Sequence, residues 1–261
     1  MNEEMNMADR VAHAWHPPGA VSTGVFVLIV LAVAGLFMWA VSRTASAERR
    51  TRDLGLAAVG LALYMGLPAA GMLSGFFTLE FLPVPTLMVF FLVSNVTAAG
   101  FAFSPLGRRF AMALPAAWLI APQALRLPLE LVLHTWHDGG TLPVQMTFEG
   151  HNFDIVSGIL GLVVGLWALR GQPPRWALLV ANTVGLLLLF GVMTIALLSS
   201  PVPFQAYPDP PLVIAFFFPY GWILPMCVSA ALFGHIVAFR ALFSSQRSRQ
   251  GDERNPHEGT E

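Results

Sequence analysis

The chain has 261 residues, of which 56% are hydrophobic and 11% charged, with a mean hydropathy of +0.65 and a net charge of -1. An ordinary soluble domain carries about 25% charged residues, so this chain has too few charges to cover a water-exposed surface. The near-neutral charge, with basic residues only in short clusters, also excludes nucleic acid as a partner. The composition is that of an integral membrane protein, whose exterior contacts the lipid bilayer.

Two features of the composition exclude particular chemistries. Only one cysteine is present, Cys227, so neither an internal disulfide nor a thiolate metal cluster can form. We expect this thiol, in an apolar run, to be a small buried side chain. All fourteen basic residues are arginines, and without lysine no Schiff-base mechanism is available.

Seven apolar segments follow one another along the chain. A helix needs about 20 apolar residues to cross a hydrocarbon core about 30 Å thick. The fifth segment is short and the seventh is long, and we expect prolines to kink the seventh at Pro219 and Pro225 and to bend the second and fourth at Pro68 and Pro115. We predict an all-α fold, a polytopic seven-helix transmembrane bundle, with spans near Val21–Val41, Leu54–Phe77, Val84–Phe103, Phe110–Leu133, Ile155–Leu169, Trp176–Leu198 and Leu212–Phe243.

The arginines predict the orientation of this bundle. They fall in the first, third and fifth connections and at the C-terminal end, while the second, fourth and sixth connections contain none. Positive residues stay on the cytoplasmic side of a membrane, so we predict an N-terminus outside and a C-terminus in the cytoplasm. Only Arg10 and Arg126 depart from this pattern.

Both ends of the chain lie outside the predicted transmembrane domain, which covers residues 21–243. The segment 1–20 is acidic and lacks the basic start of a secretory signal, so we expect it to remain as an extracytoplasmic N-terminal segment. Residues 244–261 are polar with few apolar side chains and are predicted to form a disordered cytoplasmic tail.

The most polar stretch between the first and last apolar segments is HTWHDGGTLPVQMTFEGHNFD, residues 134–154, in the fourth connection. Within it Gln145 and Thr147 alternate with Met146 and Phe148, which predicts a short extended segment with one wet face. We therefore expect the connection to fold back onto the outer side of the bundle.

Arg126 and Glu130 precede this connection one helical turn apart, and His134 follows one turn later, so the three share a helical face. The helix rises about 26 Å between Arg109 and Arg126, which places Arg126 near the outer edge of the hydrocarbon, where it can pair with Glu130. We predict an outward-facing polar vestibule that binds an ion or small solute or carries protons, formed by Arg126, Glu130, Gln145, Asn152 and Asp154.

Less specific interpretations of these residues stay open. Arg126 can be an interfacial arginine whose charge its neighbour satisfies. Asn152 or Asp154 can cap the fifth helix by accepting a hydrogen bond from a free backbone amide. The positive end of that helix would still face the vestibule and favour an anion there.

A weaker pattern is that of the histidines His134, His137 and His151. His134 and His137 can share a transition metal if the helix continues through both, with carboxylates or His151 completing the site. This is a hypothesis only, because Gly139 and Gly140 are expected to end the helix there, and histidines are also common in wet interfacial loops. No other cofactor is indicated.

Polar residues inside the apolar segments include Asn95, Asn182 and His235. An unpaired amide is costly at this depth, so we expect Asn95 to find a partner on another helix, and helix packing is the default role of all three. His235 lies in the inner half of the seventh segment, at a depth opposite to that of His134, which disfavours a haem held by two histidines.

The stretches PLELVLH, PVQMTFEGHNFDIVSG and FFFPYGWILPMCVSAALFGHIVAFRAL resemble an uncharacterised group of bacterial multi-spanning membrane proteins. The resemblance covers the fourth, fifth and seventh segments. It implies a bacterial cytoplasmic (inner) membrane location and suggests Glu130, Gln145, Asn152, Asp154 and His235 as positions to test. It implies no activity.

Three functions are consistent with these patterns. The first is a transporter or permease for a small solute or ion, which uses the polar vestibule. The second is a metal-dependent membrane enzyme or assembly factor that uses the three histidines. The third is a non-catalytic sensor or accessory subunit, whose outer loop docks a membrane or periplasmic protein partner. The charged pair beside a folded polar loop favours transport slightly.

Overall fold

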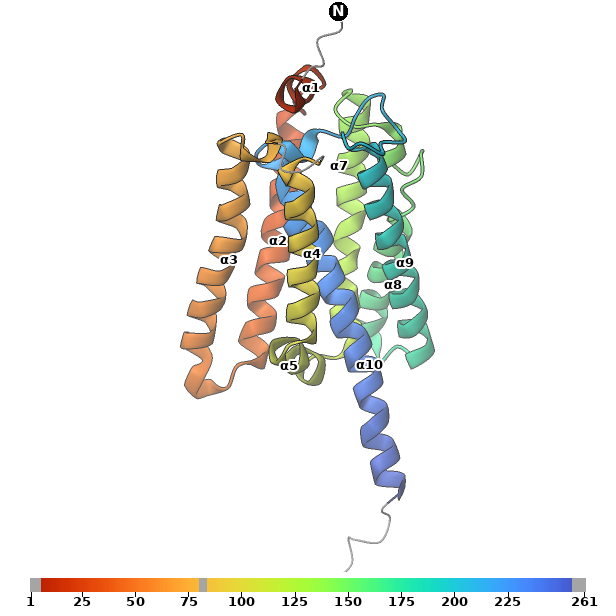
Figure 1. Ribbon diagram of the computed structural model, residues 1–261. Coiled ribbons are helices and arrows are strands. Elements are labelled where there is room, and N and C mark those ends of the chain that lie inside the picture. Colours follow the sequence, from red (N-terminus) through yellow and green to blue (C-terminus); the bar gives the residue numbers. More distant parts are fainter. Residues whose placement is uncertain (1–5, 80–83, 255–261) are drawn as a thin grey trace, which may run out of the picture.

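The computed structural model describes residues 6–79 and 84–254, and this part of the chain is all helical, without a β-strand (Figure 1). The helices stand side by side as a bundle, and the short α1 lies across its upper end in Figure 1. The α-helices are α1 (Met7–His13), α2 (Ala20–Thr44), α3 (Arg50–Leu73), α4 (Thr86–Phe103), α5 (Pro105–Ala113), α6 (Ala116–Ile120), α7 (Arg126–Asp138), α8 (Ile155–Arg170), α9 (Arg175–Ser199) and α10 (Ala230–Arg254).

Six helical segments are long and apolar enough to cross a membrane. They are Ala20–Thr44, Ala47–Leu73, Thr86–Phe103, Ala116–Asp138, Arg175–Ser199 and Tyr220–Ser244. The remaining apolar helix, α8, has 16 residues, a rise of about 24 Å, which is shorter than a hydrocarbon core of about 30 Å. The chain is thus a helical bundle of the membrane-spanning kind with six spans by length, and the seventh span remains a prediction.

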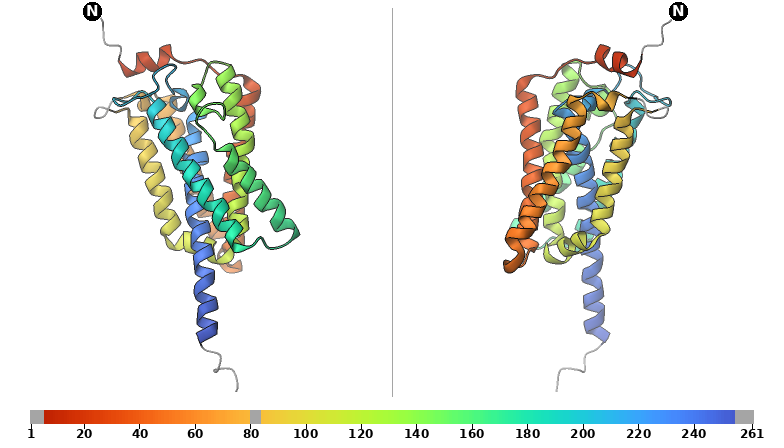
Figure 2. Two further views of the ribbon diagram at one scale, coloured as in Figure 1. Left: turned by 90° about the vertical axis from the view of Figure 1, so that its right-hand side faces the viewer. Right: turned by 60° about the vertical axis from the view of Figure 1, so that its left-hand side comes forward.

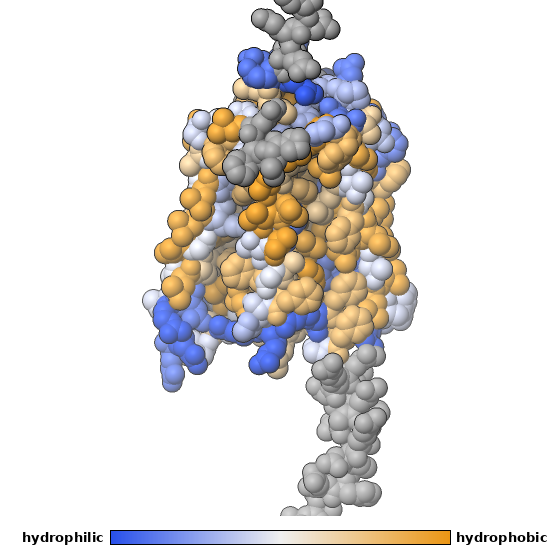
Figure 3. All heavy atoms as spheres, in the orientation of Figure 1, coloured by the Kyte–Doolittle hydropathy of each residue, from blue (hydrophilic) through white to orange (hydrophobic). Residues whose placement is uncertain are grey.

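The helices alternate in direction, so the arginine-containing connections gather at one end. In Figure 1 the connection from α2 to α3, helix α5 and the connection from α8 to α9 all lie at the lower end, while α1 lies at the upper end. Figure 3 shows a band of apolar side chains on the visible face, with hydrophilic residues at its lower edge. We call the lower end the arginine-rich end and the upper the loop end; which of them faces the cytoplasm remains a prediction.

Several predicted boundaries are wrong. The fourth segment does not start at Phe110, because α5 is a separate helix and the extended backbone at Leu114 and Pro115 breaks the chain before α6. The seventh does not start at Leu212: helical structure becomes continuous at Tyr220 and includes a π-helical stretch, Ile223–Ser229, around Pro225. At the C-terminus α10 extends to Arg254; the disordered tail over 244–261 stays a prediction, and residues 255–261 lie outside the described residues.

Helix α3 is the least embedded part of the bundle (Figure 2). Of its most apolar window 11% is buried, against 28 to 44% in the other five spans. Its buried residues, Pro68 and Met72, both lie near its loop end. The rest of α3 packs on α2 and leaves its other faces to the surroundings.

An aromatic cluster holds the loop end together. The Trp136 ring lies edge-on to the rings of Phe26 and Tyr220, with centroids 5.3 Å apart in both pairs, and its Nε1 donates to Ser22 Oγ at 3.0 Å. The Thr141 hydroxyl donates to the carbonyl of His16, 2.8 Å away. These contacts fix the start of the connection between α7 and α8.

The connection 139–154 is folded into the bundle, as expected from the sequence. Seven of its side chains are buried, namely Thr141, Leu142, Pro143, Met146, Thr147, Asn152 and Asp154. The predicted extended segment is wrong, because Val144–Met146 forms a single 3-10 turn and only Thr147 after it is extended. Irregular backbone is tolerated at membrane depth only where protein buries it, and this connection fills the space that the short α8 leaves.

Candidate functional site

The site begins with a break in the fourth helical segment. Between α6 and α7 the backbone tightens into a 3-10 helix, Ala121–Leu125, which contains Pro122. Helix α8 packs closely against this break, because a Cβ on Gly161 would lie 2.6 Å from the backbone nitrogen of Ala124 and one on Gly158 would lie 2.8 Å from the Leu127 side chain. Only glycines allow this approach, which brings the start of α8 beside the start of α7.

Arg126, the first residue of α7, is buried in this junction. Its Nε donates to Gln123 Oε1 at 2.9 Å, and its Nη1 forms an ion pair with the Asp154 carboxylate at the start of α8. We expected Arg126 to pair with Glu130. Its direct ion-pair partner is instead Asp154. Asp154 occupies the N-cap position of α8 but makes no side-chain capping bond, because its carboxylate faces the arginine.

Glu130 lies one turn along α7 and is 1% exposed. The Asn152 amide donates to both of its carboxylate oxygens, at 2.9 and 3.0 Å, and to the Met146 carbonyl at 3.0 Å. Asn152 Oδ1 in turn accepts from the Asp154 backbone amide at 3.1 Å. In the described part of the chain Glu130 forms no ion pair, so an amide is the direct partner of this buried carboxylate.

Three polar atoms of this cluster are buried without a hydrogen-bond partner. They are Arg126 Nη2, Asp154 Oδ1 and Ser157 Oγ. Ser157 is three residues after Asp154, on the same face of α8. Buried polar atoms in proteins nearly always have partners, so these atoms offer unused hydrogen-bonding capacity to a ligand inside the bundle.

The cluster continues toward α9 and α10. His235 Nδ1 lies 2.9 Å from Asn182 Oδ1, and Asn182 Nδ2 donates to the His235 carbonyl at 3.0 Å. This pairing places the hydrogen on Nδ1 and leaves Nε2, which is buried and unpartnered, as an acceptor. A Cβ on Gly185 would lie 2.7 Å from His235 Cε1 and 3.6 Å from Ser157 Oγ, so the imidazole edge and the serine face the same glycine.

Asn182 and His235 therefore join α9 to α10 through these hydrogen bonds. Asn95 differs from the prediction, because its amide donates to the Phe91 carbonyl of its own helix at 2.9 Å and its Oδ1 is unpartnered. Gln145 lies in the connection, but its Oε1 is buried without a partner, and the hydrogen bonds of the Arg126 cluster do not include its side chain.

A cavity of about 160 Å³ reaches the cluster from the side, between α2, α5, α6, the start of α7 and the N-terminal part of α10. Its wall is mostly apolar, and its polar side chains include Gln123 and Arg126. Cys227 also lines it and is half-buried, which corrects the expectation of a fully buried thiol.

The structure separates the histidines proposed as metal ligands. His134 Nε2 lies 3.7 Å from Asp138 and 4.0 Å from Glu149, His137 Nδ1 lies 2.9 Å from the Leu142 carbonyl, and His151 stacks on Tyr207. Among the residues that the structure describes, no group of three or more His, Cys, Asp or Glu side chains is placed to hold a metal ion.

No protein-family model, curated protein or solved structure matches this chain. The resemblance to a bacterial membrane-protein group therefore gains no support from these comparisons, and any functional assignment depends on the site itself. Ser157 and the Gln123–Arg126 contact were missed by the sequence analysis. The spacing of Ser157 from Asp154 was the available signal, but it is too common in helices to select one serine.

Proposed function

We propose that this integral membrane protein is a proton-linked transporter of a small anionic solute, with its binding site in the Arg126 cluster. Ionisable groups buried in membrane segments are costly and are by default functional. The observation that carries the proposal is Glu130, a carboxylate 1% exposed and without an ion pair in the described residues, one turn from the buried Arg126–Asp154 pair.

The charges of the cluster explain the link to protons. Arg126 contributes one positive charge, and Asp154 and Glu130 one negative charge each when ionised, so the cluster then carries one net negative charge. A proton on Glu130 neutralises it and lowers the cost of bringing in an anion. In this mechanism Glu130 binds and releases the proton, and the unpartnered Nη2 of Arg126 anchors the anion.

The surroundings of the cluster support a path that is closed on one side. The cavity beside α2 reaches Arg126, and unpartnered groups of Ser157 and His235 extend the polar surface along α8 and α10. Beyond them an apolar cluster closes the bundle toward the arginine-rich end, with Ala117, Ile120, Val164, Leu178, Ala181, Ala238 and Leu242 as its buried members. Transport would require this cluster to open.

The two competing hypotheses have weaker structural support. Within the described residues no assembled ligand set favours a metal-dependent enzyme or assembly factor. The sensor or accessory-subunit hypothesis needs a loop that is free to dock a partner, whereas much of the 139–154 connection is buried against its own bundle.

A flux assay tests the proposal. Protein in liposomes with a trapped pH indicator would be given chloride, nitrate, phosphate or acetate under an imposed pH gradient. We expect proton movement that depends on at least one of these anions, and its loss in Glu130→Gln, which keeps the size of the side chain but cannot ionise. Glu149→Gln is the matched control, because Glu149 lies outside the Arg126 cluster, in the 139–154 connection, with its side chain 57% exposed.

Two results would contradict the proposal. One is a wild-type protein that moves none of the four anions together with protons. The other is a Glu130→Gln protein with the flux of the wild type.

A further inference from the structure

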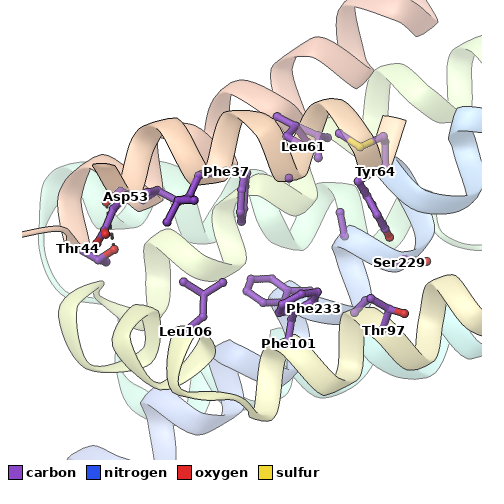
Figure 4. Close-up of a pocket in the computed structure, with 18 of the residues that line it drawn as sticks. Phe37, Thr44, Asp53, Leu61, Tyr64, Thr97, Phe101, Leu106, Ser229 and Phe233 are labelled. Carbon is purple, nitrogen blue, oxygen red and sulfur yellow. Dashed lines mark hydrogen bonds between the residues drawn. The ribbon is translucent and has the colours of Figure 1, made fainter. Parts of the chain in front are cut away.

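A second cavity, of which Arg126 is not a lining residue, lies between α2, α3, α4, α5 and α10 (Figure 4). Its volume is about 430 Å³, within the range of about 300–1,000 Å³ that is typical of ligand pockets. Its lining is almost entirely apolar, and the side chains of Phe37, Leu61, Phe101 and Phe233 point into it. We call this cavity the α3–α4 groove.

The groove opens sideways because α3 is attached mainly through α2. Leu56 on α3 is 66% exposed and Phe101 on α4 is 55% exposed, and both line the groove. Gly60, one turn after Leu56 on α3 and also in the lining, has no atom within 4 Å of the position of a Cβ. In a membrane-spanning bundle such an opening faces the hydrocarbon, so an apolar chain can enter from the bilayer without crossing water.

The polar groups of the groove lie near its two ends. At the arginine-rich end Arg109 Nη2 contacts Asp53 Oδ2 at 2.9 Å and the Thr44 carbonyl at 3.3 Å. Arg52 is not a lining residue, but its Nη2 lies 3.5 Å from Asp53 Oδ1. Two guanidinium groups thus share one carboxylate, which leaves a net positive charge at this mouth. The side chains of Arg109 and Arg52 are 46% and 67% exposed, so both can contact a further anion.

Near the other end of the groove three hydroxyls satisfy one another, and Tyr64 and Ser229, which carry two of them, belong to its lining. Tyr64 Oη lies 2.9 Å from Ser94 Oγ, which lies 2.9 Å from Ser229 Oγ. These hydroxyls need no ligand partner, whereas the two arginines carry one unbalanced positive charge. The positive charge at the mouth therefore favours an anionic group there. The apolar lining favours a hydrocarbon chain inside the groove.

From this arrangement we infer that the α3–α4 groove is a binding site for an anionic phospholipid, with an acyl chain along the groove and its phosphate at Arg52 and Arg109. Arginine suits this role because its planar guanidinium can donate two parallel hydrogen bonds to phosphate oxygens. The lipid would belong to the leaflet at the arginine-rich end. This site shares no ionisable residue with the Arg126 cluster, although its groove and the cavity beside that cluster have Val33, Phe37, Met226, Ala230 and Phe233 in common. The inference is tested by lipid binding and not by flux, so it and the transport proposal can fail separately.

Native mass spectrometry of the detergent-solubilised full chain tests this inference, with phosphatidylglycerol as the anionic probe and phosphatidylcholine as the zwitterionic one. We expect one phosphatidylglycerol to remain bound at a concentration at which phosphatidylcholine is lost. Arg52→Gln is expected to reduce this preference about fivefold, the effect of one arginine near an anionic headgroup.

A second pair of variants separates the groove from the surface of α3. Gly60→Phe fills the groove and should abolish phosphatidylglycerol retention. Gly66→Phe is the matched control, because Gly66 lies on the same exposed helix, has no atom within 4 Å of a Cβ position and is not part of the groove lining. Equal thermal stability of the two variants would show that both are folded.

Three outcomes would overturn the inference. The first is equal retention of the two lipids by the wild type, and the second is full phosphatidylglycerol binding by Gly60→Phe. The third is an equal loss of binding in Gly66→Phe, which would indicate general adsorption to α3.

Discussion

The α7–α8 junction and helix α3 show two ways in which an apolar chain builds a membrane bundle. At the junction, glycines bring two backbones together and a buried ion pair connects them. Along α3 the glycines Gly55, Gly60 and Gly66 meet no neighbour within 4 Å, and most of the helix surface is left to its surroundings. Lipid can solvate an apolar helix face but not an unpaired charge, so buried charges must be paired within the protein, whereas an apolar helix face can stay uncovered.

The largest effect is expected at the ion pair. Asp154→Ala leaves Arg126 buried without its carboxylate, and breaking a buried pair in this way costs about 3–5 kcal/mol of unfolding free energy. The double variant Arg126→Met/Asp154→Ala should recover most of this loss, because replacing both charges by apolar groups is often neutral. Reversible unfolding in detergent micelles measures both.

Asp138→Ala provides the control for this experiment. Its carboxylate is 64% exposed at the end of α7, so its removal should change stability by no more than about 0.5 kcal/mol. If Asp154→Ala were as stable as Asp138→Ala, the junction would not depend on the ion pair.

An intermediate effect is expected from the close approach of α8. In Gly161→Ala the new methyl would lie 2.6 Å from the Ala124 nitrogen, and a backbone atom cannot retreat as the end of a flexible side chain can. Overpacking of this kind costs about 1–3 kcal/mol. The same unfolding assay checks it, and an unchanged stability would show that α8 can shift away without loss.

The smallest effect is expected on α3, and in the opposite direction. Gly66→Ala meets no neighbour within 4 Å and replaces a glycine in the interior of a helix, which should stabilise the protein by about 0.5–1 kcal/mol. Chemical unfolding of Gly66→Ala and Gly161→Ala compares the change in unfolding free energy on α3 with that at the α7–α8 junction. A destabilisation equal to that of Gly161→Ala would mean that α3 is packed as tightly as α8.

The sequence analysis recovered part of the candidate site. It selected Arg126, Glu130, Asn152 and Asp154, which the structure gathers into one buried cluster, because charged and amide groups next to apolar segments are rare in this composition. It assigned the wrong ion pair, however. The spacing of Arg126 and Glu130 along one helix is visible in the sequence, whereas the approach of Asp154 depends on how α8 meets the break at Ala121–Leu125.

The histidines were grouped by the sequence analysis, but the structure separates them. The spacing of His134 and His137 suggested a shared metal, but their contacts diverge, because His137 turns to the Leu142 carbonyl while His134 lies beside acidic groups. A spacing of three residues places two side chains near each other on a helix surface. Which groups they then contact depends on how the following connection folds.

The sequence by itself determined that this is an all-helical membrane-type protein, where its main apolar helices lie, that its arginine-containing connections gather at one end, and that the 134–154 connection is the polar part of the opposite end. Hydropathy and charge determine these features because they depend on the composition of each segment. Only the tertiary structure decided that Asp154 pairs with Arg126, that α8 packs against the break at Ala121–Leu125, and that α3 packs mainly on α2 and leaves a groove. Those features depend on the relative rotation and depth of helices, which are set by contacts between residues far apart in the chain.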